Sequence, residues 1–181
     1  MNRGLLAVRY AKALLAYAIE VGEADALYPI FGKLRYALRS SQEVVANPTL
    51  SEQTRAEAVV AMAGEGAPAL FGRFVDLVFC HNRESLLADM AMAYVRLYRR
   101  HKGITFVGVR SAVPLDEHTQ QRIAEMVHRQ RGGEIEMQVE VEEGLLGGFV
   151  LRVDGEVLDG SARSAIERIR QQFVSKNKTL V

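Results

Sequence analysis

Apolar residues recur every three to four positions through the first hundred residues, and every second position in parts of the remainder. The first spacing indicates amphipathic helices, because an α-helix turns once in about 3.6 residues, and the second indicates strands with one buried face. Short breaks containing glycine, proline or asparagine separate the helical segments. The pattern predicts helices over residues 4–21, 23–39, 51–63, 68–80 and 84–101, with one helical turn near 41–46.

The pattern changes at Lys102-Gly103. Residues 104–113 are rich in β-branched side chains and predict a strand. Asp116 is a suitable N-cap for a following helix, which Gly132-Gly133 ends. In the next segment, Ile135, Met137, Val139 and Val141 alternate strictly with Glu134, Glu136, Gln138, Glu140 and Glu142. This alternation predicts a strand with one buried and one solvated face.

A hairpin and a helix are predicted after residue 147. Asp154-Gly155 lies between short apolar runs and favours a type I′ turn, which needs positive φ at both positions. Asp159 and Ser161 are both suitable helix N-caps. The apolar face of the following helix carries Ala162, Ala165, Ile166, Ile169 and Phe173. We expect Ile166, Ile169 and Phe173 to support the core.

These elements predict an α+β protein with two domains. Residues 1–103 are expected to form a bundle of about six helices, because short connections favour antiparallel neighbours. Residues 104–181 are expected to form a small α+β domain with a short mixed sheet and a terminal helix.

Composition narrows the function without naming it. The chain has 181 residues, 49% of them apolar, and a formal net charge of +1, which argues against a polyanion-binding surface over the whole protein. No secretory signal is recognisable, and no apolar run approaches the roughly 20 residues of a membrane span, so we expect membrane association only through partners. The single cysteine, Cys80, cannot form an internal disulfide and is predicted to be buried as a small hydrophobe.

No pattern of catalytic, metal-binding or cofactor-binding residues stands out. The glycines Gly144, Gly147 and Gly148 are not followed by Gly-Lys-Ser/Thr, and the four histidines lack metal-ligand spacing. A basic cluster, Arg96 to Lys102, lies at the predicted end of a helix, where the helix dipole favours cations. An RNA-binding or other two-domain adaptor is the alternative function, although no stacking motif accompanies that cluster.

Two helices carry more apolar surface than one core needs. A helix packed on one side shows an apolar arc somewhat wider than about 100°. The helix at 4–21 is apolar over roughly two-thirds of its circumference, and the arc of the helix at 68–80 spans roughly 200° at about 100° per residue. Both helices could lie at the centre of the bundle. Alternatively, they could form a groove for an amphipathic helix from another protein.

One motif near the C-terminus is specific. Gly147-Gly148, an apolar strand, the Asp154-Gly155 turn and Asp159-Gly160-Ser161-x-Arg163 follow one another. This run resembles the C-terminal signature of the delta subunit of bacterial F-type ATP synthases, which is related to the mitochondrial oligomycin-sensitivity-conferring protein. Tyr10-Ala11-Lys12-Ala13-Leu14 resembles that family's first helix. The stretch 74–83 resembles its fifth helix and turn, with His81-Asn82-Arg83-Glu84 where the family commonly has Asn-Gly-Arg.

The resemblance implies a non-catalytic stator subunit of a proton- or sodium-driven rotary ATP synthase. It implies that the first domain binds the N-terminal helices of alpha subunits of the catalytic head, and a contact with beta subunits is a further possibility. It also implies that the second domain binds the C-terminal ends of the b subunits. No cofactor or nucleic acid is expected, and the location implied is peripheral, on the cytoplasmic face of the bacterial plasma membrane. By position, the implied groove residues are Tyr10, Ala11, Leu14, Phe74, Val75 and Val78.

Overall fold

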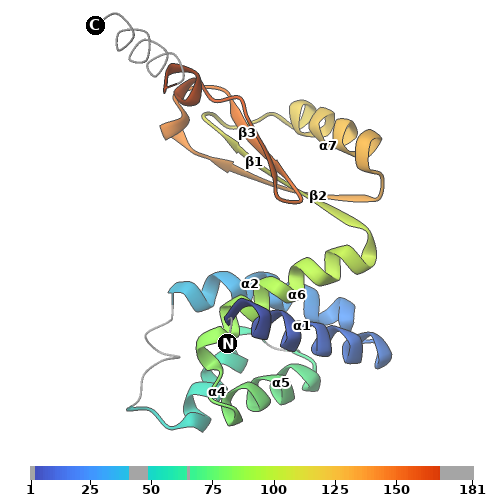
Figure 1. Ribbon diagram of the computed structural model, residues 1–181, viewed down its shortest axis with the longest axis vertical. Helices are drawn as coiled ribbons and strands as arrows, with labels where there is room; N and C mark the ends of the chain where they lie inside the picture. The colour runs from blue at the N-terminus through green and yellow to red at the C-terminus, as the bar shows by residue number, and fades with distance from the viewer. Residues whose placement is uncertain (1–2, 41–48, 65, 168–181) are drawn as a thin grey trace, which may run out of the picture. The chain divides into compact units, whose positions relative to one another are not determined.

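The computed structural model describes residues 3–40, 49–64 and 66–167 (Figure 1). The chain divides into two compact units, Met1–His101 and Lys102–Val181. This division lies two residues before the boundary expected from composition. Each unit is described separately below.

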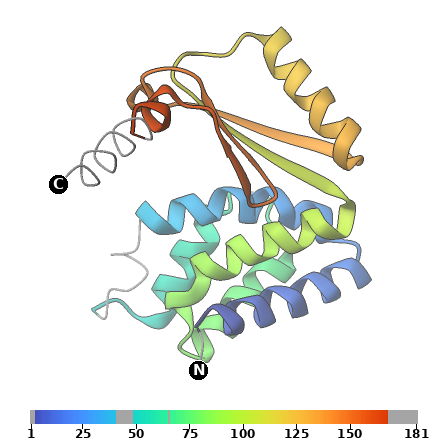
Figure 2. The same ribbon diagram turned by 45° about the horizontal axis from the view of Figure 1, so that its top comes forward.

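The first unit is helical. Its helices are α1 (Arg3–Glu20), α2 (Ala24–Ser40), α4 (Glu52–Met62), α5 (Ala69–Cys80) and α6 (Leu87–Lys102), with a 3₁₀ turn, η1 (Glu84–Leu86), before α6 (Figure 2). These bounds agree with the predicted helices to within three residues. The predicted turn near 41–46 lies outside the described residues.

Local hydrogen bonds explain where these helices start and stop. Ser51 caps α4, because its hydroxyl oxygen accepts a hydrogen bond from the Thr54 amide at 3.1 Å. The α5 helix ends in a Schellman motif, in which the Arg83 amide donates to the Val78 carbonyl at 2.9 Å. Asn82 occupies the left-handed position of this motif with φ of 53°. Asparagine tolerates that conformation, so the turn forms without a glycine.

Aromatic rings from three helices fill the core of the first unit. Phe31 of α2 stacks on Tyr94 of α6, with ring centroids 4.5 Å apart, and meets the rings of Phe71 and Phe74 of α5 edge-on. The Tyr94 hydroxyl donates to the Ala24 carbonyl at 3.2 Å, and burial raises the pKa of Tyr94 well above its usual value. The core thus joins α2, α5 and α6 through one cluster of rings.

The second unit is a mixed sheet with a helix on one face. Its elements are β1 (Ile104–Ser111), α7 (Glu117–Arg131), β2 (Glu134–Val141), the 3₁₀ turn η2 (Glu143–Leu145), β3 (Phe149–Val153) and β4 (Glu156–Asp159). The strand order is β2-β1-β3-β4. The β1–β2 pair is parallel and the other two pairs are antiparallel. The predicted α+β fold with a mixed sheet is therefore confirmed.

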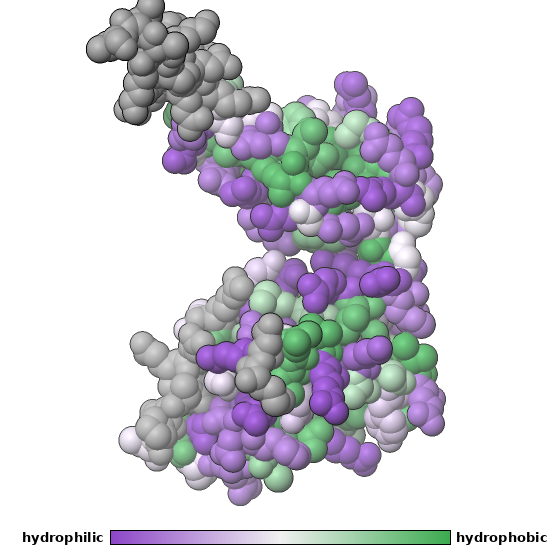
Figure 3. Space-filling view, viewed as in Figure 1, coloured by the Kyte–Doolittle hydropathy of each residue, from purple (hydrophilic) through white to green (hydrophobic). Residues whose placement is uncertain are grey.

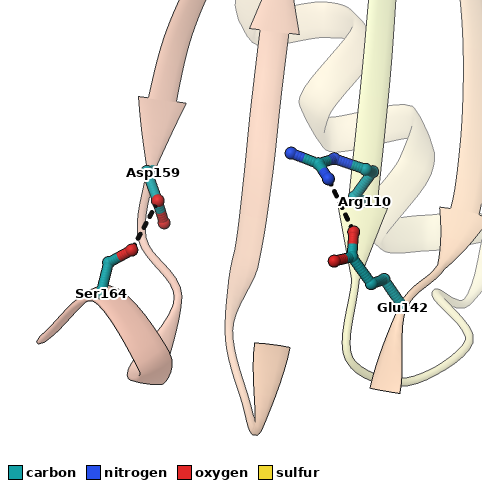
Figure 4. A network of polar contacts seen from close by, with 4 residues as sticks. All are labelled: Arg110, Glu142, Asp159 and Ser164. Atoms are coloured by element: carbon teal, nitrogen blue, oxygen red, sulfur yellow. Dashed lines mark hydrogen bonds and ion pairs between the residues drawn. The ribbon is translucent and has the colours of Figure 1, made fainter. Parts of the chain in front are cut away.

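The core of this unit lies between the sheet and α7. Val107 and Val109 of β1 and Leu151 of β3 pack against Ile123 and Val127 of α7. Ile135, Met137 and Val139 of β2 join this core, whereas Val141, predicted on the same apolar face, is 52% exposed. Residues 135–139 are all half-buried, so the burial along β2 does not alternate as the sequence predicted. On the opposite face Arg110 pairs with Glu142, whose oxygen lies 2.7 Å from the guanidinium (Figure 4).

The signature segment folds as the predicted hairpin and helix start. Asp154 and Gly155 form the turn between β3 and β4, both with positive φ (47° and 101°). Ser161 is the cap of the terminal helix, because its hydroxyl oxygen accepts from the Ser164 amide at 3.2 Å. Asp159 braces this start by accepting from the Ser161 amide and from the Ser164 hydroxyl (Figure 4). Arg163 follows on the exposed side and lies near Glu167.

Two further burial predictions are wrong. Cys80 is exposed, because the inward direction of α5 is set by Val78, and a residue two positions later points about 200° away. Ile166 is more than half exposed and does not support the core. Its helix presents the smaller Ala162 toward the sheet, near Gly147. Ile169 and Phe173 lie outside the described residues.

Candidate functional site

A groove of about 640 Å³ runs between α1 and α5. From α1 it is lined by Leu6, Arg9, Tyr10, Ala13, Leu14 and Tyr17. From α5 it is lined by Leu70, Arg73, Phe74, Leu77 and His81. Within each helix these positions, some of them adjacent pairs, recur every three or four residues, so they form one stripe along one face. We call this feature the α1–α5 groove.

Each stripe covers about 12 residues, which corresponds to a length of about 16 Å at 1.5 Å per residue. The walls are mostly aliphatic and aromatic. Tyr17 is 47% exposed and Leu77 is 48% exposed, although both are large side chains with substantial apolar surface. In the space-filling view, apolar patches appear between polar side chains on the face of the first unit that is turned to the viewer (Figure 3).

The structure separates the six residues singled out by position into two sets. Tyr10, Leu14 and Phe74 line the groove. Ala11, Val75 and Val78 are buried on the bundle side of the same helices and do not line it. All six belong to the wide apolar arcs, but each arc contains two stripes, of which only one faces outward.

Several groove residues were missed by sequence reasoning. Leu6, Ala13 and Tyr17 lie at helical spacing from Tyr10, as Leu70 and Leu77 do from Phe74. That spacing was visible in the sequence. The direction of each stripe was not, because the neighbouring stripe of buried alanines on α1 has the same period.

The groove also settles how α1 and α5 are placed in the bundle. A central position would bury both helices on every side. Instead, Tyr17 and Ile19 of α1 and Leu77 of α5 remain substantially exposed. In the chain by itself, each helix uses one stripe for the bundle and has a second stripe that is partly open to solvent: Tyr17 and Leu77 are exposed, whereas Leu14 and Phe74 are almost fully buried.

The groove wall carries two guanidinium groups, those of Arg9 and Arg73, and one imidazole. Arg9, Arg73 and His81 line it, and no carboxylate does so among the described residues. The His81 ring nitrogen Nδ1 lies 2.8 Å from the Leu77 carbonyl oxygen, which holds the ring at the end of α5. A second hollow has the opposite character, because Asp76, about 60° around α5 from Arg73, lines it together with Glu52 and Glu57 of α4.

The basic cluster at the end of α6 is partly tied into the bundle. Arg99 donates from Nε to the Tyr28 hydroxyl at 2.8 Å, and its guanidinium lies over the Tyr28 ring. The Tyr28 ring in turn stacks on Tyr98. Arg99 therefore serves the packing of α2 against α6. In residues 3–40, 49–64 and 66–167, no group of three His, Cys, Asp or Glu side chains could hold a metal ion.

Comparison with known proteins decides the family. The model of the family described as "ATP synthase delta (OSCP) subunit" matches residues 6–173. The chain belongs to this family. The ATP synthase subunit delta of Phocaeicola vulgatus is 35% identical over 185 residues and that of Bacteroides thetaiotaomicron is 33% identical over 187 residues, each match covering 100% of both chains. The subunit delta of Synechococcus elongatus is 32% identical, over 88% of this chain and 91% of that one.

A solved structure shows the same fold. A chain in the cryo-EM structure of the Toxoplasma gondii mitochondrial ATP synthase hexamer superposes with a TM-score of 0.73, at 22% identity, over 93% of this chain and 97% of that chain. Members of the ATP synthase delta family are non-catalytic stator subunits of an enzyme complex. The predicted coupling role is thereby confirmed, and the RNA-binding alternative is not favoured. None of the described helices is long and apolar enough to span a membrane.

Proposed function

We propose that this delta-family chain links the catalytic head of a rotary ATP synthase to the b subunits, so that the head does not turn with the rotor. In this proposal the α1–α5 groove binds the N-terminal helix of an alpha subunit. The second unit binds the C-terminal ends of the b subunits, and the whole protein is peripheral, on the cytoplasmic face of the bacterial plasma membrane.

The observation that carries the proposal is the open apolar stripe on each wall of the groove. An amphipathic helix lays its apolar face into such a groove through residues spaced three and four apart. A length of about 16 Å accommodates about three turns of that helix. Leu77, Tyr17 and their neighbours would then lose their contact with water, and this loss supplies the driving force for binding.

The second unit also presents apolar surface suited to a partner. Val157 and Leu158 of β4 are more than half exposed, as is Ile166 at the start of the terminal helix. Phe149, at the start of β3, is exposed as well. These residues are close in the chain to the family signature, and β4 is an edge strand of the sheet. We propose that this surface contributes to the contact with the b subunits.

The change Leu77→Asp tests the groove. Burial of a leucine side chain contributes about 1.5–3 kcal/mol, so placing a carboxylate there should raise the Kd of a peptide copying the alpha N-terminus by about tenfold or more. Isothermal titration calorimetry on the full chain measures this. Ile19→Asp is the matched control, because Ile19 is an exposed α1 residue outside the groove.

The choice of position matters for this test. Val78 is fully buried, so Val78→Asp would place an unpaired charge in the core and destabilise the bundle itself. An unchanged peptide affinity in a folded Leu77→Asp variant would refute the groove assignment.

A further inference from the structure

Two charged residues of α5, opposite in sign, line different hollows. Arg73 lies on the wall of the α1–α5 groove, and Asp76, three residues later, lies on the wall of the second hollow. Arg9 adds a second guanidinium from α1 and His81 lies at the end of the stripe. The groove thus combines an apolar floor with cationic groups from both walls.

We propose that Arg9 and Arg73 select the occupant of the α1–α5 groove by charge. The occupant is an amphipathic helix whose apolar stripe is flanked by carboxylates, with the carboxylates facing these two guanidinium groups. This inference rests on the proposed function of the groove and adds a specificity rule to it: apolar contact supplies the affinity, and the sign of the flanking charges decides which helix binds.

The surroundings of the two arginines leave their charges available. Both residues are exposed, and neither guanidinium forms an ion pair with another residue in the described part of the chain. An arginine side chain can lay its aliphatic part along an apolar wall while its charged end stays in water. A helix seated in the groove would therefore meet one cationic end from each wall.

The expected difference in Kd between helices follows from the exposure of the ion pairs that the two arginines would form with the bound helix. An exposed ion pair usually changes an equilibrium by a factor of about 1.5 to 5, and like charges oppose binding by a similar factor. Two arginines acting together should therefore separate an acidic-flanked from a basic-flanked helix by about tenfold or more. Because salt screens exposed charges over about 8 Å at physiological ionic strength, the separation should shrink as salt rises.

Three peptides with one apolar stripe test the rule. They differ only in their flanking positions, which carry glutamate, glutamine or lysine. Their Kd values for the full-length protein are measured by calorimetry at low and high salt. The same titrations are run on the double variant Arg9→Glu/Arg73→Glu. Asp76→Lys is the matched control, because it reverses a charge on the same helix at a residue that lines the second hollow and not the groove.

The glutamate-flanked peptide should bind tightest and the lysine-flanked peptide weakest. The order should invert in the double variant, be unchanged in Asp76→Lys, and narrow at high salt. Circular dichroism confirms that each variant is folded, as expected for changes at exposed positions. Equal affinities of the three peptides, or an order that the double variant leaves unchanged, would overturn the charge rule.

A peptide copying the alpha N-terminus separates failure of this rule from failure of the proposed function. If that peptide binds in a Leu77-dependent way while the three flanked peptides bind equally, only the charge rule is wrong. If neither it nor any flanked peptide binds, the groove does not take a helix, and both proposals are wrong.

Discussion

Gly148 is held in a conformation that a side chain would disturb. Its φ is 74°, in the left-handed region, and a Cβ built on it would lie 2.3 Å from the Gly160 carbonyl oxygen. Gly160 belongs to the same family signature and leads into the capped helix start at Ser161. A glycine is thus needed at position 148, where its backbone meets that of Gly160.

We expect Gly148→Ala to destabilise the second unit by about 2 kcal/mol or more, because left-handed backbone strain is joined by a backbone clash. Two other glycines serve as controls. Gly155→Ala has positive φ but open space around it and should cost less, whereas Gly144→Ala has neither problem and should be nearly neutral. Urea unfolding of the three variants measures the difference. Equal stability of Gly148→Ala and Gly144→Ala would contradict this account.

Among the elements, α7 shows how a single cap couples stability to pH. The Asp116 carboxylate accepts from the Thr119 amide at 2.6 Å. The hydrogen bond from the backbone amide, followed by that from the Thr119 hydroxyl, lowers the pKa of Asp116. Because the pKa is lower in the folded state, the carboxylate stabilises α7 above the usual aspartate pKa, and this contribution is lost as the pH falls through the folded value.

Asp116→Asn should remove this pH dependence and keep a cap, because asparagine is also a favourable N-cap residue. The difference in unfolding midpoint between wild type and variant should therefore be present at neutral pH and change as the pH is lowered below about 4. Urea titrations at several pH values measure it. A difference that stays constant from pH 7 to pH 3 would show that the carboxylate's charge does not matter to the cap.

In α1 and in α5, the wide apolar arc has two parts: one packs into the bundle and the other lines the groove. Ala7, Ala11 and Ala18 of α1 let it pack closely into the bundle, while Leu6, Tyr10 and Tyr17 form the open wall. The same division holds for Val75 and Val78 against Leu77 in α5. A substitution in either helix therefore changes stability or binding according to which stripe it lies on.

At the scale of the whole molecule, the chain consists of two compact units that meet in sequence at His101-Lys102. In the proposed function each unit has its own partner, so force would pass through this junction. Gly103 lies just after α6 with a φ of 69°, and β1 begins at the next residue. The junction is therefore short, with no long linker between the last helix of one unit and the first strand of the other.

Limited trypsin digestion should produce two stable fragments by cleavage at Lys102. Each unit has its own core and could fold alone, whereas Gly103 is exposed beside the scissile bond. Mass spectrometry identifies the fragments, and Lys102→Gln should slow their appearance. One resistant core that retains residues from both sides of the junction would argue for a single continuous domain.

The sequence alone determined the elements, their order and the family. Periodicity, caps and turn residues act over a few neighbouring positions, so the roles of Ser161, Asp154-Gly155 and Asp116 follow from their immediate neighbours in the chain. The surplus of apolar surface on the first and fifth helices is visible in the sequence for the same reason.

Only the tertiary structure decided which stripe of each wide arc faces outward. An arc of roughly 200° fits a core on either side, and the choice depends on contacts between residues far apart in the chain. The ring cluster of Phe31, Phe71 and Tyr94 orients α5 so that Val78 is buried, Leu77 is open and Cys80 is exposed. That packing, which no local pattern encodes, places Arg9 and Arg73 on the walls of one groove.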